Sequence, residues 1–104
     1  MIPFLKNLIG LGSKIDYKAL VNQGAEIIDV RTKGEFASGH IKGSKNIPLN
    51  TLNNNLKLFK DKEKTYLLCC ASGMRSGSAK SILKSKGYSN VHNAGSWQSL
   101  NNKL

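Results

Sequence analysis

Residues 66–76, YLLCCASGMRS, decide the fold of this chain and point to its chemistry. The stretch begins as a short apolar strand and continues into a helix, because aromatic and aliphatic residues precede the cysteines and helix formers follow Arg75. A cysteine at such a junction lies where unpaired backbone N–H groups converge at the positive end of the helix dipole. Both effects favour the thiolate and can lower a cysteine pKa from about 8.5 to roughly 3.5–7.5. We therefore predict that Cys70 is a nucleophile.

The residues that follow Cys70 are suited to holding an anion. Small side chains leave the loop backbone open to a ligand, and Gly73 allows a turn with positive φ. Arg75 adds a permanent cation whose planar fork of donors matches oxyanions. The predicted substrate-binding residues are Ala71, Ser72, Gly73, Met74, Arg75 and Ser76.

The composition bounds the size of the protein and leaves its partner open. A chain of 104 residues with 39% apolar residues predicts one ordinary globular domain. The net charge of +10 attracts anions in general. The lysines are scattered without a long basic run and with few aromatic residues between them, so we do not expect nucleic-acid binding as the main function.

The cysteine and histidine spacings exclude two common kinds of site. Cys69 and Cys70 are adjacent and cannot close a loop, so this is not a disulfide framework. His40 and His92 lie far apart and no C-x-x-C is present, so we expect no metal site and no cofactor. As the strand residue one step earlier, Cys69 should point to the other side of the sheet and serve the structure.

Residues 1–12, MIPFLKNLIGLG, form an apolar segment ahead of the predicted domain, residues 13–104. The apolar side chains fit one face of a short helix. The segment is shorter than the roughly 20 residues that span a bilayer, and it lacks the layout of a secretory signal. We expect a helix packed against the domain rather than membrane contact, and a cytoplasmic location.

Strand-like and helix-like segments alternate through the rest of the chain. The strand candidates are residues 26–30, 45–49, 66–70 and 88–93. The helix candidates begin at Asp16, at the capping box of Thr32 and Glu35, at Asn50 or Thr51, and near Ser76, with a last helical turn carrying Trp97 and Leu100. This order predicts an α/β fold with a central, mostly parallel sheet and helices on both faces. Ligands of such sheets bind at the carboxyl ends of strands, where Cys70 lies.

Two separate stretches resemble the single-domain rhodaneses. One comprises Ile28-Asp29-Val30-Arg31, Glu35-Phe36, Gly39-His40-Ile41, Gly43 and Asn46-Ile47-Pro48; the other is Cys70-x-x-Gly73-x-Arg75-Ser76, which resembles the persulfide loop of that family. The likeness covers about residues 13–100 and implies a rhodanese-like three-layer domain. Two features depart from the family pattern: Ala94-Gly95-Ser96-Trp97 only approximates its Gly-Gly motif, and Cys69 is not part of the usual loop.

The resemblance also implies an activity. A rhodanese-type sulfurtransferase moves sulfane sulfur from thiosulfate or a persulfide donor to a thiol acceptor, or to cyanide in an assay, through a persulfide that here would form on Cys70. The implied partners are a small anionic sulfur donor and a thiol or protein acceptor.

Other residues are interpreted as supports for this site. Asp29 and Arg31 should brace it, and Arg31 could pair with Glu35. Arg75 stands at a helix start, where cations are disfavoured, so we expect an anion to compensate it. His40 should make a structural hydrogen bond, which leaves the loop amides and Arg75 to activate the thiolate. Trp97 should belong to the core.

Two alternatives remain open at this point. The chain could be a binding module that presents Cys70 to a partner protein as a sulfur relay, without free turnover. It could also be a cysteine phosphatase or arsenate reductase, which needs five residues between cysteine and arginine. Counting back from Arg75 gives five only from Cys69, and that register puts Ser72 where the phosphatase pattern has glycine.

Overall fold

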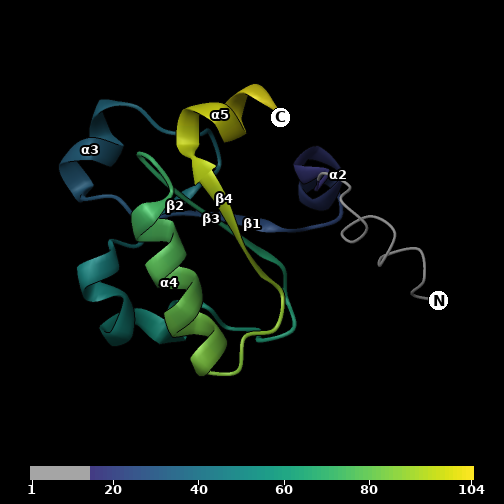
Figure 1. Cartoon of the computed structure of the whole chain (residues 1–104), viewed down its shortest axis with the longest axis vertical. Coiled ribbons are helices and arrows are strands. Elements are labelled where there is room, and N and C mark those ends of the chain that lie inside the picture. Colours follow the sequence, from purple (N-terminus) through teal and green to yellow (C-terminus); the bar gives the residue numbers. More distant parts are fainter. Residues whose placement is uncertain (1–14) are drawn as a thin grey trace.

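The computed structural model describes residues 15–104, in which four parallel strands form one sheet with helices on both faces (Figure 1). The strands are β1 (Glu26–Asp29), β2 (Lys45–Asn46), β3 (Tyr66–Cys70) and β4 (Val91–Ser96), in the order β2-β1-β3-β4. The helices are α2 (Tyr17–Asn22), α3 (Lys33–Ser38), the 3-10 helix η1 (Leu49–Leu58), α4 (Met74–Ser85) and α5 (Trp97–Asn102). The predicted α/β fold is confirmed. The helix predicted over residues 1–12 lies outside the described residues.

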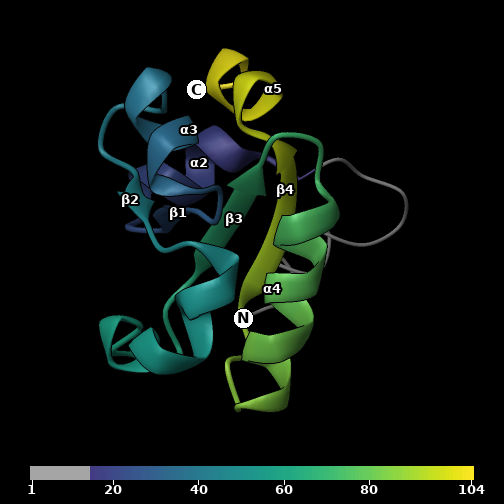
Figure 2. The ribbon, with the colours of Figure 1, turned by 90° about the vertical axis from the view of Figure 1, so that its left-hand side faces the viewer.

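β3 lies between β1 and β4, and all five of its residues are buried. Because side chains alternate along a strand, β3 serves two separate cores. Tyr66, Leu68 and Cys70 face the η1–α4 core, which η1 and α4 cover, while Leu67 and Cys69 face the α2–α5 core, which α2 and α5 cover. Figures 1 and 2 show α4 and α2 on opposite sides of the sheet. The sheet is therefore covered on both faces, as its continuous apolar strands require.

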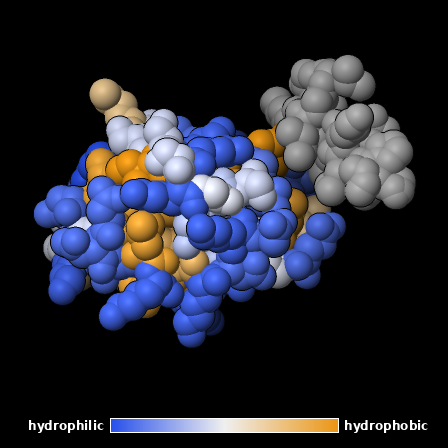
Figure 3. All heavy atoms as spheres, turned by 90° about the horizontal axis from the view of Figure 1, so that it is seen from below, coloured by the Kyte–Doolittle hydropathy of each residue, from blue (hydrophilic) through white to orange (hydrophobic). Residues whose placement is uncertain are grey.

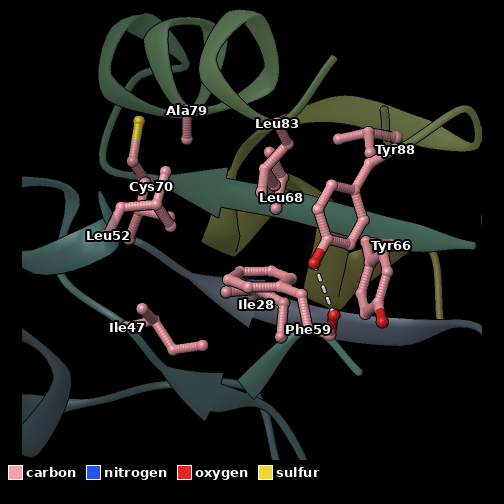
Figure 4. Packing of buried hydrophobic residues seen from close by; sticks show 12 residues of the cluster. Ile28, Ile47, Leu52, Phe59, Tyr66, Leu68, Cys70, Ala79, Leu83 and Tyr88 are labelled. Carbon is pink, nitrogen blue, oxygen red and sulfur yellow. Dashed lines mark hydrogen bonds between the residues drawn. The ribbon is translucent and has the colours of Figure 1, made fainter. Parts of the chain in front are cut away.

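Aromatic rings fill the end of the η1–α4 core that is farther from Cys70 (Figure 4). Phe59, Tyr66 and Tyr88 pack edge to face, with ring centroids 5.1 to 6.0 Å apart. The Tyr88 hydroxyl donates a hydrogen bond to the carbonyl oxygen of Phe59 at 2.6 Å, so this buried polar group is satisfied. These contacts fix η1 and the turn after α4 on the same face of the sheet.

Two helix starts form as their sequences predict. The Asp16 side chain accepts a hydrogen bond from the amide of Ala19 and begins α2. In α3, the Thr32 hydroxyl accepts from the amide of Glu35, and the Glu35 carboxylate accepts from the amide of Thr32. This capping box satisfies two donors that the helix itself cannot. It also holds the Glu35 carboxylate at the start of α3.

The helix after Pro48 differs from its prediction in start and type. It begins at Leu49 rather than after Asn50 or Thr51, and it is a 3-10 helix with non-helical backbone at Asn55 (φ −125°, ψ 25°). The Asn55 side chain donates to the carbonyl oxygen of Thr51, which competes with regular helical hydrogen bonding. The helix still presents an apolar face to the sheet: Leu52 and Phe59 are buried and Leu56 packs against them.

The molecular surface is mostly polar on the face shown in Figure 3. Figure 3 shows hydrophilic residues over most of one face, with apolar side chains visible between them. Met74, the first residue of α4, is an exception, with 81% of its surface exposed. Within residues 15–104 no helix is both long and apolar enough to cross a membrane.

Candidate active site

The candidate site lies where β3 ends and α4 begins. Cys70 is the last residue of β3, and the loop 71–73 leads directly into α4. Gly73 is the N-cap of α4 and has a left-handed backbone (φ 106°) that other residues rarely adopt. A Cβ at this position would lie 3.4 Å from the Cα of Gly95, an ordinary contact distance, so it is the backbone conformation that requires glycine. Glycine is therefore needed for the loop to turn back over the cysteine.

The sulfur of Cys70 lies inside this turn. Its Sγ accepts a hydrogen bond from the amide of Gly73 at 2.9 Å and lies 3.5 Å from the Ser76 hydroxyl. Burial raises the pKa of Cys70, but hydrogen bonds from the Ser76 hydroxyl and the amides of Ser76, Gly73 and Ser72 outweigh it and leave the pKa below its ordinary value. Figure 4 shows the side chain projecting from the end of β3 toward α4. The geometry therefore favours a thiolate at Cys70.

Cys69 has the opposite surroundings. Its side chain is fully buried in the α2–α5 core, on the other face of the sheet from Cys70. Desolvation raises the pKa of this thiol to about 12, and the nearby Asp29 carboxylate adds to the rise. Both cysteines are free thiols. Cys69 thus belongs to the core as an uncharged thiol, as the sequence predicts.

Asn93 holds the loop from β4, and sequence reasoning did not single it out. Its Nδ2 donates to the carbonyl oxygen of Gly73 at 3.0 Å, and its Oδ1 accepts from the Ser76 hydroxyl at 2.6 Å. The amide of Gly95 donates to the same Oδ1 at 3.0 Å. A β-bulge in the β3–β4 pairing, after the Leu68–Asn93 pair, sets these positions. No local pattern marks an asparagine for this task, because its partners lie on other elements.

Asp29 and Arg31 form a buried ion pair at the end of β1. Arg31 Nη2 lies 2.7 Å from Asp29 Oδ2, and Asp29 Oδ1 also accepts from the amide of Arg31. Arg31 further donates to the carbonyl oxygens of Glu35 and Gly39, and its guanidinium lies 4.8 Å from the centre of the Trp97 ring. The pair joins β1 to α3, to the C-cap residue of α3 and to α5. These contacts fit a bracing position.

The expected pairing of Arg31 with the Glu35 side chain is wrong. The Glu35 carboxylate instead binds Arg75 through two parallel hydrogen bonds, Nη1 to Oε1 at 2.7 Å and Nη2 to Oε2 at 3.0 Å. Arg31 reaches only the Glu35 backbone, because Asp29 already holds its guanidinium. Arg75 does have the compensating anion that its place at a helix start predicts, and that anion is Glu35. Hydrogen bonds from Arg75, then from Thr32, lower the pKa of Glu35 to about 2.

The other predicted residues lie around this centre. Ala71 and Ser72 are exposed on the loop, Met74 is exposed at the start of α4, and Ser76 is buried in the first turn of that helix. His40 makes its structural contact as expected: Nδ1 lies 2.7 Å from the carbonyl oxygen of Phe36, and the two rings stack. Trp97 is half-buried against the α2–α5 core.

A shallow hollow adjoins the loop. It has a volume of about 220 Å³ and is lined by Val30, Thr32, Pro48, Leu49, Asn50 and Arg75. Most of these residues follow the carboxyl ends of β1 and β2, so the hollow lies at the edge of the sheet where Cys70 ends β3. Such an edge is the usual ligand position in a parallel sheet. Residues 15–104 bring together no cluster of three His, Cys, Asp or Glu side chains that could hold a metal.

The chain is similar to known proteins in sequence. Residues 13–103 match the profile of the family described as "Rhodanese-like domain". The thiosulfate sulfurtransferase PspE of Escherichia coli K12 is 39% identical over 69 residues, 65% of this chain and 66% of that protein. YqhL of Bacillus subtilis is 38% identical over 69 residues, 66% of this chain and 54% of that protein. The chain thus spans between about half and two thirds of the length of these relatives.

Solved structures share the fold. An E. coli rhodanese with bound anions superposes with a TM-score of 0.68 at 36% identity, covering 72% of this chain and 89% of that one. The human single-domain sulfurtransferase TSTD1 superposes with a TM-score of 0.70 at 27% identity, covering 85% of this chain and 91% of that one.

Proposed function

The chain belongs to the rhodanese-like sulfurtransferase family, and from that premise we propose that Cys70 carries the transferred sulfur as a persulfide. The observation that carries the proposal is the Gly73 amide pointing at Cys70 Sγ from 2.9 Å at the start of α4. That amide, with the Ser76 hydroxyl, favours a charged sulfur in a site otherwise sealed by the core.

In the first half-reaction the Cys70 thiolate attacks the outer sulfur of thiosulfate or of another sulfane donor. A bond forms between the two sulfurs, the bond from the outer sulfur to the sulfite group breaks, and sulfite leaves with the electron pair. The product is an anionic Cys70 persulfide. Its terminal sulfur keeps the single negative charge that the thiolate had, and the loop 71–76, including Arg75, is proposed to hold it.

In the second half-reaction an acceptor thiolate attacks the terminal sulfur of the persulfide. The acceptor gains that sulfur and, with one proton from solvent, becomes a persulfide itself, while Cys70 returns as a thiolate. The scheme assigns no general base to this chain, because hydrogen bonds from the loop and from Ser76 favour the thiolate form of Cys70. This agrees with His40, which is held by the carbonyl oxygen of Phe36 and stacked on its ring.

A second candidate is a sulfur relay that hands the persulfide sulfur only to a partner protein. The observation that favours it is Met74, the first residue of α4, which has 81% of its surface exposed. Exposed apolar side chains of this kind suit protein contact. The phosphatase or arsenate reductase reading needs Cys69 as nucleophile, and burial holds that thiol uncharged with a pKa of about 12.

The test is intact-protein mass spectrometry after the reduced protein meets thiosulfate. The expected result is a gain of one sulfur atom, which cyanide or a dithiol then removes. Absence of that adduct would contradict sulfur transfer. Steady-state transfer to a small thiol separates the two candidates, since a relay forms the adduct once and turns over only with its partner.

A further inference from the structure

Both oxygens of the Glu35 carboxylate bind the guanidinium group of Arg75. Two parallel hydrogen bonds join them, at 2.7 and 3.0 Å, across 40 residues of sequence. Glu35 Oε1 also accepts from the amide and the hydroxyl of Thr32, at 3.0 and 3.1 Å. The carboxylate is thus held by α3 as well as by α4. Because Thr32 already holds the Glu35 carboxylate, little further side-chain freedom is lost when the two parallel hydrogen bonds to Arg75 form.

This pair changes the charge that the site presents. Only two of the 16 basic residues are arginines, and in the structure each faces a carboxylate: Arg31 faces Asp29 and Arg75 faces Glu35. The guanidinium groups at the carboxyl end of the sheet therefore carry no net charge with their partners. The large positive excess of the chain resides on lysines spread along the sequence. Although the chain as a whole is basic, the positive charges of its two arginines are balanced by Asp29 and Glu35.

We propose that Glu35 sets the sulfur-donor preference of the site, because its bond to Arg75 disfavours dianionic thiosulfate relative to donors of lower charge. The inference rests on the proposed function and specifies its substrate class. Glu35 touches no reacting atom in this scheme; it acts through Arg75, as a specificity-determining residue. The favoured donors are sulfane compounds with one negative charge or none.

The effect of the Glu35 charge on the two kinds of donor should be small and should depend on donor charge. Glu35 and Arg75 are each about one third exposed, at 38% and 36%, so solvent screens the field of either charge. Removing the Glu35 charge should therefore multiply the second-order rate constant (kcat/KM) by only about threefold for each negative charge on the donor. A dianion then gains about tenfold and a monoanion about threefold. The factor for the dianion is thus about the square of the factor for the monoanion. A general change in the loop would not produce this relation between the two donors.

The experiment uses Glu35→Gln with two donors that differ in charge and little in shape. Glutamine keeps an oxygen that can accept from Thr32 and Arg75, so α3 keeps its cap. The donors are thiosulfate and methanethiosulfonate anion, in which a methyl group replaces one charged oxygen; sulfite leaves from the first and methanesulfinate from the second. Rates of Cys70 persulfide formation are measured at low and at high salt. Glu35→Gln should raise the thiosulfate rate constant about tenfold and the methanethiosulfonate rate constant about threefold at low salt, less at high salt.

Three further variants serve as controls. Glu63→Gln makes the same chemical change in the exposed turn before β3, at the other end of the strands, and should alter neither donor. Thr32→Val removes the cap hydroxyl but leaves every charge in place, and should not alter the ratio of the two rate constants. In an Arg75→Gln background the effect of Glu35→Gln on that ratio should shrink, because the interaction belongs to the pair.

Equal changes for both donors, or no change for thiosulfate, would overturn the proposal. So would a matching change of the ratio in Thr32→Val. If the wild-type protein forms no persulfide with either donor, the proposed function fails instead. Cys70→Ser, which lacks the nucleophile, then tests the effect of charge on binding alone: NMR titration should show tighter thiosulfate binding after Glu35→Gln, and unchanged affinity would reject the proposal.

Discussion

Cys69 and Cys70 are neighbours on β3, yet the two faces of the sheet give their thiols opposite acidity. Cys69 points into the α2–α5 core, where desolvation raises its pKa to about 12. Cys70 points to the other face, where burial also raises the pKa but hydrogen bonds from Ser76, Gly73 and Ser72 lower it further than burial raises it. Both side chains are fully buried. The comparison teaches that burial alone does not decide thiol reactivity; the donors that meet the sulfur do.

The largest expected effect comes from replacing each cysteine by serine. Cys70→Ser should lower persulfide formation by more than about a thousandfold, because a serine hydroxyl is too weakly acidic to replace a thiolate. Cys69→Ser should keep most of the activity. The measurement is the rate of sulfur adduct formation by intact-protein mass spectrometry.

The stability of the same variants is the control. Cys69→Ser places a hydroxyl in a buried apolar site and should lower the free energy of unfolding by about 1–3 kcal/mol. An active Cys70→Ser, or an inactive but folded Cys69→Ser, would show that Cys69 is the nucleophile. The phosphatase or arsenate reductase alternative, which counts from Cys69 to Arg75, would then have to be considered again.

Alkylation kinetics should separate the two thiols next. On single-cysteine variants, iodoacetamide should label Cys70 at pH 7 at least about a hundredfold faster than Cys69, because only the thiolate reacts. As pH falls, the Cys70 rate should decline with a midpoint below the ordinary value of about 8.5. Stopped alkylation followed by peptide mass spectrometry from pH 4 to 10 measures both profiles.

Ser76→Ala sharpens this comparison. It removes one of the hydrogen bonds that lower the pKa of Cys70, so the Cys70 midpoint should move up while the Cys69 profile stays unchanged. A midpoint that does not move would mean that the Gly73, Ser72 and Ser76 amides suffice to hold the thiolate.

The smallest expected effect is on stability at alkaline pH. The folded-state pKa of Cys69 is about 12, above that of an unfolded cysteine. The stability from keeping this thiol neutral is fully present below the unfolded pKa and is lost as pH rises toward 12. Between pH 8 and pH 10 the wild type should therefore lose about 1.5 kcal/mol more than Cys69→Ala. Urea unfolding of both proteins at the two pH values tests this.

Cys70 provides the contrast of sign. The folded-state pKa of Cys70 lies below the unfolded one, so its contribution to stability is present above the unfolded pKa and is lost as pH falls through the folded pKa.

The alkaline prediction for Cys69 has a clear contrary outcome. A Cys69→Ala protein that loses as much stability as the wild type at pH 10 would show that Cys69 ionises as easily in the folded protein as in the unfolded chain.

Elements with local sequence signals could be predicted before the fold was known. The capping box of Thr32 and Glu35 and the N-cap at Asp16 are encoded within three residues and form as expected. The alternation of strand and helix segments predicts the parallel sheet, and the strand parity puts the two cysteines on opposite faces. The place of Cys70 at a strand–helix junction was readable for the same reason, since the donors near its sulfur belong to the next six residues.

The contacts between distant groups at the site depend on how the elements pack in three dimensions. Glu35 could have paired with Arg31, four residues away, but the fold gives Arg31 to Asp29 and brings Arg75 to Glu35 from 40 residues away. Asn93 likewise reaches Gly73 and Ser76 from the neighbouring strand. Composition and spacing do not specify such contacts, because a carboxylate or an amide binds whichever donor the packing of other elements places within about 3 Å. The acidity of Cys70 is therefore largely a local property, whereas the charge that faces its substrate is a property of the whole fold.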